Sequence, residues 1–368
     1  MENLKKFKTK KLSKFAMTNI LSYGMILLAF VVLFPLQSAG MINNSISGQL
    51  VPICTYIVMA ISLNLTVGFL GELSLGHAGF MSVGAFCGVI TAACLQQNGI
   101  SSAPVILIIS IIVGGIFAGI MGLVIGIPVI RLRGDYLAIV TLAFGEIIKN
   151  IINCLYVGVD GRGLHINMSG ADALNMESGR LILNGPQGAV GITKIATFGS
   201  GIILILISLF IVLNLINSKT GRAVIAIRDN RIAAESVGIG ITKYKLTAFI
   251  ISAIIAGMAG ALYAMNFSTI AARKFDFNTS ILILVFVVLG GMGNIPGTIL
   301  ATTLLYMLPE LLRQFADYRM LIYAIILILV MLLTNNSRVK QFTVQIGSKL
   351  NRKKESILSD GEGGGTNG

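Results

Sequence analysis

Long apolar segments alternate with short polar connections along most of the chain, from about residue 20 to residue 333. An α-helix needs about 20 predominantly apolar residues to cross the hydrocarbon core of a membrane. The pattern therefore predicts about ten transmembrane segments, at 20–37, 49–70, 76–96, 104–128, 136–156, 196–217, 246–266, 279–293, 296–312 and 318–333. The segments 279–293 and 296–312 are short for a span, which indicates broken or re-entrant helices whose backbone is buried in protein or lines a cavity.

Composition places the chain outside the class of ordinary soluble proteins. Among its 368 residues, 55% are hydrophobic and only 12% are charged, whereas about 25% charged is usual. The 42 glycines suit helix packing in lipid, where small residues let backbones approach closely. Two histidines, and four cysteines without metal-ligand spacing, give no indication of a metal site. We therefore predict an all-α integral membrane protein, built as a polytopic helix bundle.

The basic residues predict the orientation of this bundle. Lysine and arginine concentrate in segment 1–19, in the turn after the fourth span, in 218–245 and in the tail 335–368. Cytoplasmic segments carry the excess of basic residues in membrane proteins, so we expect both termini to be cytoplasmic. The net charge of +13 then reflects topology and not nucleic-acid binding. The transmembrane domain is predicted over 20–334, with an extracytoplasmic loop at 157–195 that is long enough to hold a small substructure.

The segment 219–245, KTGRAVIAIRDNRIAAESVGIGITKYK, is a charged island between two apolar spans. Its basic residues are interleaved with Ala, Val and Ile at near-helical spacing, which predicts one or two short amphipathic helices outside the membrane core. Thr220 is a candidate N-cap, and Gly238 and Gly240 are candidate helix stops. The island fits a docking surface for a partner, and the alternative is a solvated loop whose charge only fixes topology.

Polar residues also interrupt the apolar pattern between the second and third spans. Asn64, Glu72, Ser74 and His77 lie there among glycines, and Glu146 lies within the fifth span. Ionisable groups at membrane depth are costly and often functional, so these five residues are candidates for a translocation pathway. The alternative is an interfacial turn that shapes the bundle, with Glu146 paired to a neighbouring lysine.

Sequence motifs for catalysis are missing. The chain contains no phosphate-binding loop of the Gly-x-x-x-x-Gly-Lys-Ser/Thr type, no His-Glu-x-x-His and no Gly-x-Ser-x-Gly. We therefore expect no enzyme activity and no cofactor bound by this chain. Energy for any pumping has to come from a partner or from an ion gradient.

Four motifs in order carry a resemblance to a known family. They are LSLGHAGF at 73–80, RLRGDYLAIVTLAFGE at 131–146, GRAVIAIRDNRIAAESVGI at 221–239, and VLGGMG at 288–293 followed by Gly297. Together they resemble the permease subunits of ABC importers, specifically the branched-chain amino acid permease family, over residues 57–323. The chain departs from the family pattern by a long insertion that begins near Val157.

The resemblance implies a transport subunit in the cytoplasmic membrane of a bacterium or archaeon. Its implied partners are two ABC ATPase subunits, a homologous permease subunit and an extracytoplasmic solute-binding protein, with ATP and magnesium acting only in the ATPases. The island would be the coupling loop that contacts the ATPase, through Gly221, Arg222, Ala223, Arg228, Asp229, Ala233, Ala234 and Gly238. The implied substrates are leucine, isoleucine and valine.

Two alternatives stay open at this point. Related ABC permeases carry urea, short amides or nucleosides, and substrate choice belongs largely to the binding protein. An ion-coupled secondary transporter would instead call for an inverted repeat of spans and paired charges within the membrane. No clear internal repeat is visible in the sequence, which favours the ABC importer.

Overall fold

The computed structural model describes residues 19, 21–37, 39–40, 43–132, 134–161, 163–174, 176, 179–315 and 318–335. The predicted cytoplasmic segments 1–19 and 335–368 lie almost entirely outside the described residues. The chain divides into two compact units, 1–307 and 308–368. The second unit contains the end of α11 (Ile295–Leu311), a 3₁₀ turn at Leu312–Phe315 and α12 (Arg319–Asn335).

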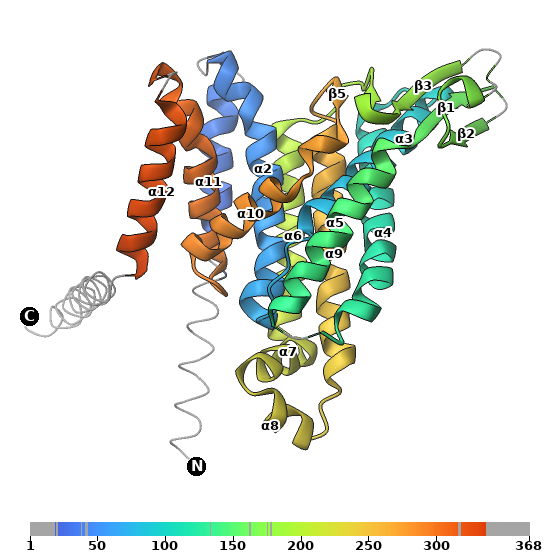
Figure 1. Ribbon diagram of the computed structural model, residues 1–368. Helices are drawn as coiled ribbons and strands as arrows, with labels where there is room; N and C mark the ends of the chain where they lie inside the picture. Colours follow the sequence, from blue (N-terminus) through green and yellow to red (C-terminus); the bar gives the residue numbers. More distant parts are fainter. Residues whose placement is uncertain are drawn as a thin grey trace, which may run out of the picture. The chain divides into compact units, whose positions relative to one another are not determined.

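The first unit is mainly a bundle of helices (Figure 1). Each predicted span overlaps one helix, although the helix ends differ by a few residues. The described helices of the first unit are the helix Leu21–Gln37, α2 (Asn44–Asn64), α3 (His77–Gln97), α4 (Ala103–Val129), α5 (Asp135–Asn153), α6 (Phe198–Asn217), α7 (Lys219–Asp229), α8 (Arg231–Ser236), α9 (Ile241–Ala264), α10 (Phe277–Gly290) and the start of α11.

Within the described part of the chain, five helical segments are long and apolar enough to cross a membrane. They are Ser45–Leu70, His77–Gln97, Ala103–Val129, Phe198–Asn217 and Ile241–Ala264. Two further apolar helices, Leu21–Gln37 and Ile295–Leu311, are shorter. The polytopic character is therefore evident, while the number of ten spans stays a prediction.

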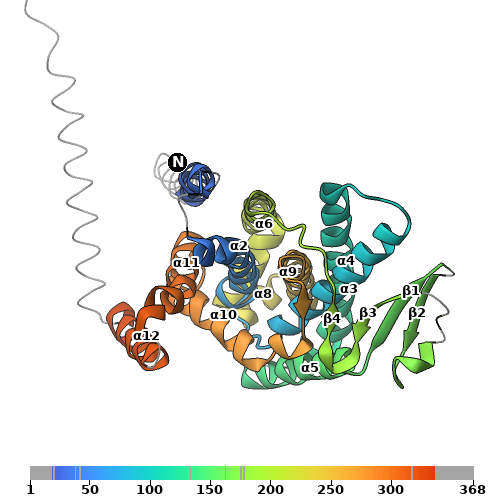
Figure 2. The ribbon, with the colours of Figure 1, turned by 90° about the horizontal axis from the view of Figure 1, so that it is seen from above.

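Helices α3, α4 and α9 pack closely, as the view from above shows (Figure 2). A Cβ atom added at Gly84 of α3 would lie 2.0 Å from the carbonyl oxygen of Gly257 in α9. Such backbone contact explains the small residues on these helices. The opposite face of α4 exposes Ile108, Ile112 and Ile116, and this apolar row at helical spacing suits a lipid environment.

A five-stranded antiparallel sheet corrects the prediction of an all-α fold. Its strands are β1 (Tyr156–Asp160), β2 (Gly163–Asn167), β3 (Gly179–Asn184), β4 (Ala189–Val190) and β5 (Thr269–Ile270), in the order β2-β1-β3-β4-β5. Four strands come from the predicted loop 157–195, where apolar residues at Val157, Val159, Ile182 and Leu183 supply buried positions. The fifth strand follows α9, so part of the pairing joins segments far apart in the sequence.

Candidate functional site

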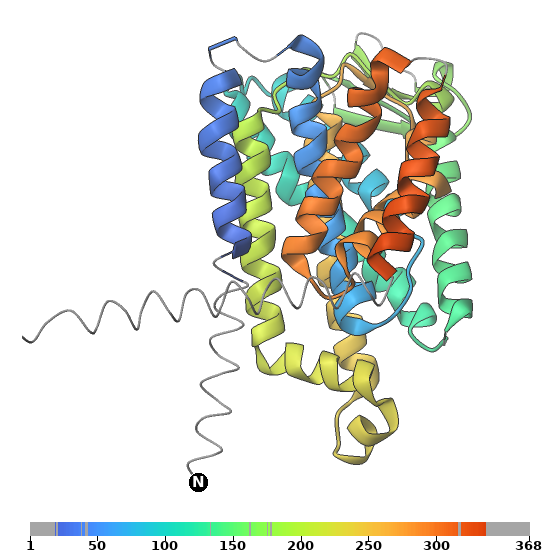
Figure 3. The ribbon, with the colours of Figure 1, turned by 90° about the vertical axis from the view of Figure 1, so that its left-hand side faces the viewer.

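The charged island folds as two short helices, α7 and α8, which project beyond one end of the first unit's bundle (Figure 3). Ser218 caps α7, because its hydroxyl oxygen accepts a hydrogen bond from the backbone N–H of Gly221 at 3.2 Å. The predicted N-cap at Thr220 is therefore wrong by two residues, since Thr220 lies inside the first turn. Asn230 caps α8 by accepting from the backbone N–H of Ala233 at 3.0 Å.

Gly238 ends α8, as predicted. Its φ of +83° is a left-handed conformation that glycine adopts without strain. Its N–H donates to the carbonyl of Glu235 at 3.0 Å, and the N–H of Ile239 donates to the carbonyl of Ala234 at 3.0 Å. This is a Schellman cap. Gly240 does not end α8 but lies directly before α9.

The two helices are amphipathic. Ala223, Val224, Ile227 and Ala234 are buried, whereas Ala233 is exposed. Ile232 and Val237 are 82% and 75% exposed. These two exposed large apolar side chains lie outside the apolar spans, where another protein could cover them.

Arg228 connects α7 to the bundle. Its Nη1 donates to the carbonyl of Gly68 at 2.8 Å, while its Nε and Nη2 donate to Asp229 Oδ1 at 3.1 and 2.9 Å. Arg222 instead donates from Nη1 to the carbonyl of Asn217, at 3.0 Å, and so holds the corner between α6 and α7. Of the predicted coupling residues, Arg228 is therefore the one that reaches from α7 to the end of the second span.

Gly68 lies in a π-helical segment, Leu65–Leu70, that continues α2. Here the predicted pathway residue Asn64 joins two parts of the chain: its Oδ1 accepts from the N–H of Gly293 at 2.8 Å and its Nδ2 donates to Thr298 Oγ1 at 2.9 Å. A Cβ atom at Gly68 would lie 1.9 Å from Asn64 Oδ1 and 2.3 Å from the nitrogen of Gly293. The end of the second span is thus closely joined to the turn between α10 and α11.

His77 and Ser74 belong to a second buried group of polar residues. His77 Nε2 lies 2.8 Å from Ser252 Oγ in α9, and His77 Nδ1 lies 3.4 Å from Ser74 Oγ. Ser62 and Ser252 each donate to the other's backbone carbonyl at 2.7 Å. All four side chains are buried, so this network holds α2 and α3 against α9.

The two glutamates among the predicted pathway residues form separate ion pairs. Glu72 pairs with Lys245, which is 4% exposed, across the gap between the turn before α3 and the first turns of α9. Glu146 pairs with Lys149, three residues further along α5. No hydrogen bond among the described residues joins Glu146 to the other four candidates.

Sequence reasoning missed two partners in this region. Ser252 places a hydroxyl group inside an apolar span, and this interruption of the apolar pattern is a sequence signal for a buried polar contact. Lys245 resembles the other basic residues of the island in the sequence, and nothing in a single sequence shows that it faces Glu72. Among the residues that the structure describes, no group of three or more His, Cys, Asp or Glu side chains could hold a metal ion.

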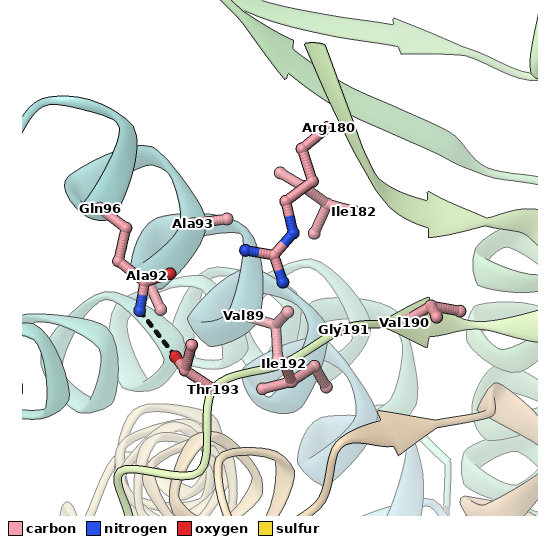
Figure 4. A pocket seen from close by; sticks show the side chains of 10 residues that line it. All are labelled: Val89, Ala92, Ala93, Gln96, Arg180, Ile182, Val190, Gly191, Ile192 and Thr193. Carbon is pink, nitrogen blue, oxygen red and sulfur yellow. Dashed lines mark hydrogen bonds between the residues drawn. The ribbon is translucent and has the colours of Figure 1, made fainter.

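At the opposite end of the bundle, Arg180 points into a small cavity between α3 and the sheet (Figure 4). The cavity holds about 20 Å³, and Gln96 Nε2 donates to Thr193 Oγ1 beside it at 2.6 Å. This is room for about one water molecule. The cavity is therefore too small for an organic solute.

Comparison with known proteins gives a consistent result. Residues 45–331 match the family described as the permease component of branched-chain amino acid transport systems. The high-affinity branched-chain amino acid transport system permease proteins LivM of Salmonella typhimurium and Escherichia coli are 35% and 34% identical to the chain over 301 and 292 residues, which cover 75% of it. The chain spans 66% of the length of each of these two relatives.

A more distant relative is the L-arabinose ABC transporter permease protein AraH of Azospirillum brasilense, which is 28% identical over 66% of this chain and 64% of its own length. No solved structure matches the chain. The family match extends over well more than half of the sequence and includes the helices that bear the polar residues described above. The chain is thus a mostly helical, polytopic membrane protein that belongs to the family of permease components of branched-chain amino acid transport systems.

Proposed function

We propose that the chain is the membrane-spanning permease subunit of an ABC importer that carries leucine, isoleucine and valine across the cytoplasmic membrane of a bacterium or archaeon. Family membership and the two LivM relatives support this assignment. In this proposal α7 and α8 lie in the cytoplasm, as do both termini. Two ATPase subunits bind there, and ATP and magnesium act in those subunits and not in this chain.

One observation carries the proposal: the element α7–α8 combines an exposed apolar surface with a direct bond to the end of a span. Ile232 and Val237 present the apolar surface to a partner. Arg228 bonds to the backbone of Gly68. A partner that moves α7 would therefore act on the second span without any intermediate loop.

The contacts beyond Gly68 suggest how such a movement travels. Asn64 joins the same segment to Gly293 and Thr298. A displacement of α7 would thus act on α2 and on the turn between α10 and α11 together. In the proposed cycle, ATP-driven closure of the ATPases moves α7–α8, and the joined helices switch the pathway between outward and inward access.

The remaining partners belong to the same proposal. A homologous permease subunit completes the pathway, and a solute-binding protein delivers the solute at the bundle end that bears the sheet, which would then be extracytoplasmic. Asn64, Glu72, Ser74, His77 and Glu146 are proposed to act near the pathway. Their packing supports a role in holding the helices that move, since Asn64, Ser74 and His77 are buried against neighbouring segments.

The test is uptake of labelled leucine into proteoliposomes that contain the chain with its co-purified ATPase and permease subunits. We expect uptake to require both ATP and the binding protein, and to be inhibited by isoleucine and valine but not by L-arabinose. Uptake driven by an ion gradient with no ATPase bound would refute the proposal in favour of a secondary transporter.

The proposed ATPase contact at Ile232 and Val237 has its own test. Replacing Ile232 and Val237 with aspartate introduces charge at the centre of the proposed contact, so we expect the ATPase to be lost on purification and uptake to fall. Glu235→Ala, at an exposed polar position of the same helix, is the matched control and is expected to retain both. ATPase retention by the double aspartate variant would show that the contact lies elsewhere.

A further inference from the structure

A cavity of about 390 Å³ lies at the C-terminal end of α9. Figure 1 shows this end of α9 and the neighbouring β5 at the end of the bundle opposite α7 and α8. The walls of the cavity come from the last turn of α9 and the segment that follows it, from β5 and from the 3₁₀ turn Ala272–Lys274. The residues that line it are Tyr263, Phe267, Thr269, Ile270, Ala271, Arg273 and Lys274. This volume falls within the range of about 300–1,000 Å³ that is usual for small-molecule sites.

The apolar wall of this cavity is firmly held. Tyr263 and Ile270 are 3% and 5% exposed. The Tyr263 ring lies 4.9 Å from the Phe267 ring, 6.0 Å from the Tyr56 ring and 6.2 Å from the Phe275 ring, measured between centroids. Such aromatic contacts fix the rings in place, so an apolar ligand group would meet a preformed surface.

The other side of the cavity carries two positive charges. Arg273 and Lys274 are exposed, and neither side chain makes a hydrogen bond or ion pair with another described residue. The nearest carboxylate along the chain, that of Asp276, is occupied as the N-cap of α10. It accepts from the backbone N–H of Thr279 at 3.0 Å and from Asn278 Nδ2 at 2.9 Å. Both cations are therefore available to an anionic ligand.

We propose that this cavity binds a small apolar carboxylate. The carboxylate would lie at Arg273, whose planar guanidinium suits two parallel hydrogen bonds to it, with Lys274 adding charge. The aliphatic side chain of the ligand would contact Tyr263, Phe267 and Ile270. In a branched-chain amino acid importer this is a landing site where the solute first contacts the permease; only the identity of the solute rests on the proposed function.

Two other cavities offer no comparable chemistry. The cavity at Arg180 has room for about one water molecule. A larger cavity of about 920 Å³, between the helix Leu21–Gln37, α2, α6 and α11, has no charged residue in its lining. The cavity at Arg273 combines sufficient volume, an apolar wall and available cations.

Fluorescence provides a direct test, because the chain contains no tryptophan. Phe267→Trp places a single reporter in the wall of the cavity. In the full-length chain, reconstituted in nanodiscs without partners, we expect L-leucine to change its emission saturably and L-leucinamide, which lacks the carboxylate, to leave it unchanged. Calorimetric titration of the unsubstituted chain with the same two compounds provides a second readout that does not depend on the tryptophan variant.

Arg273→Gln in the reporter background is expected to weaken leucine binding about tenfold, which corresponds to about 1.4 kcal/mol. Lys194→Gln removes an exposed cation that does not line the cavity, and we expect it to bind leucine unchanged. Equal binding of leucine and leucinamide would overturn the role of Arg273, and failure of leucine to bind in both readouts would overturn the site.

These outcomes separate the site from the proposed function. If leucine uptake by the assembled transporter persists while neither titration detects binding, the site is wrong and the importer stands. If the titrations detect leucine but the assembled system transports none, the importer is wrong and the site stands. If Arg273→Gln weakens docking of the binding protein without changing the leucine titration, the cations serve that protein and the site is again wrong.

Discussion

The ion pair between Lys245 and Glu72 provides a quantitative test of the packing around α9. Lys245→Met keeps the length and apolar stem of the side chain but removes its charge. Lys245 is 4% exposed, and the Glu72 side chain is 17% exposed, so the carboxylate left behind loses its partner in a poorly solvated place. Breaking a buried pair in this way costs about 3–5 kcal/mol. Because Glu72 retains some contact with water, we expect the lower end, about 3 kcal/mol.

The assay is the thermal unfolding midpoint of the purified chain in detergent. The midpoint is expected to fall by several degrees in Lys245→Met, and by less when Glu72→Gln is added, because the second change removes the isolated charge. Lys243→Met is the control: Lys243 is exposed in the same helix, so its replacement should change stability by no more than about 0.5 kcal/mol. A double variant that is no more stable than Lys245→Met would refute the idea that an uncompensated charge causes the loss.

Three further predictions follow from close contacts and a helix cap. Gly68→Ala places a Cβ atom 1.9 Å from Asn64 Oδ1, so leucine uptake should be lost. Gly240→Ala, where an added Cβ atom would have nothing within 4 Å, should retain uptake. Normal uptake by Gly68→Ala would contradict the proposed route from α7 through Gly68 and Asn64. Gly84→Ala directs a methyl group at the backbone of α9 and should lower the yield of folded protein on size-exclusion chromatography. Ser218→Ala removes the α7 cap, at a cost of about 1 kcal/mol, and should speed hydrogen exchange in α7 while leaving α9 unchanged.

The helical part of the fold follows from the sequence because a membrane helix is a continuous run of about 20 apolar residues, which a local stretch of sequence shows. The amphipathic helices of the island were also predictable, since Val224, Ile227 and Ala234 recur at helical spacing. The closure of the sheet was not predictable. Strands β4 and β5 have only two residues each, and they pair across 79 residues, from Val190 to Thr269. Local patterns contain no information about such a partner.

Several residues of the candidate site were predictable from the sequence, but their contacts were not. Asn64 and His77 attract notice in the sequence because they are polar in apolar surroundings. What they contact is set by tertiary packing: Thr298 and Ser252 lie 234 and 175 residues further along the chain. The bond from Arg228 to Gly68 involves a backbone carbonyl, which leaves no trace in the residue types at all.

The pairing of β4 with β5 also constrains the order in which the chain can be completed during synthesis. β4 precedes α6, whereas β5 follows α9. The edge of the sheet at β4 therefore has no partner until the ribosome has synthesised the helices α6 to α9 and β5. An edge strand with free N–H and C=O groups is prone to pair with other chains. β4 contains only two residues, and this shortness limits the exposure of the nascent chain during that interval. Closure of the sheet by β5 then marks the stage at which the helices from α6 to α9 have been inserted.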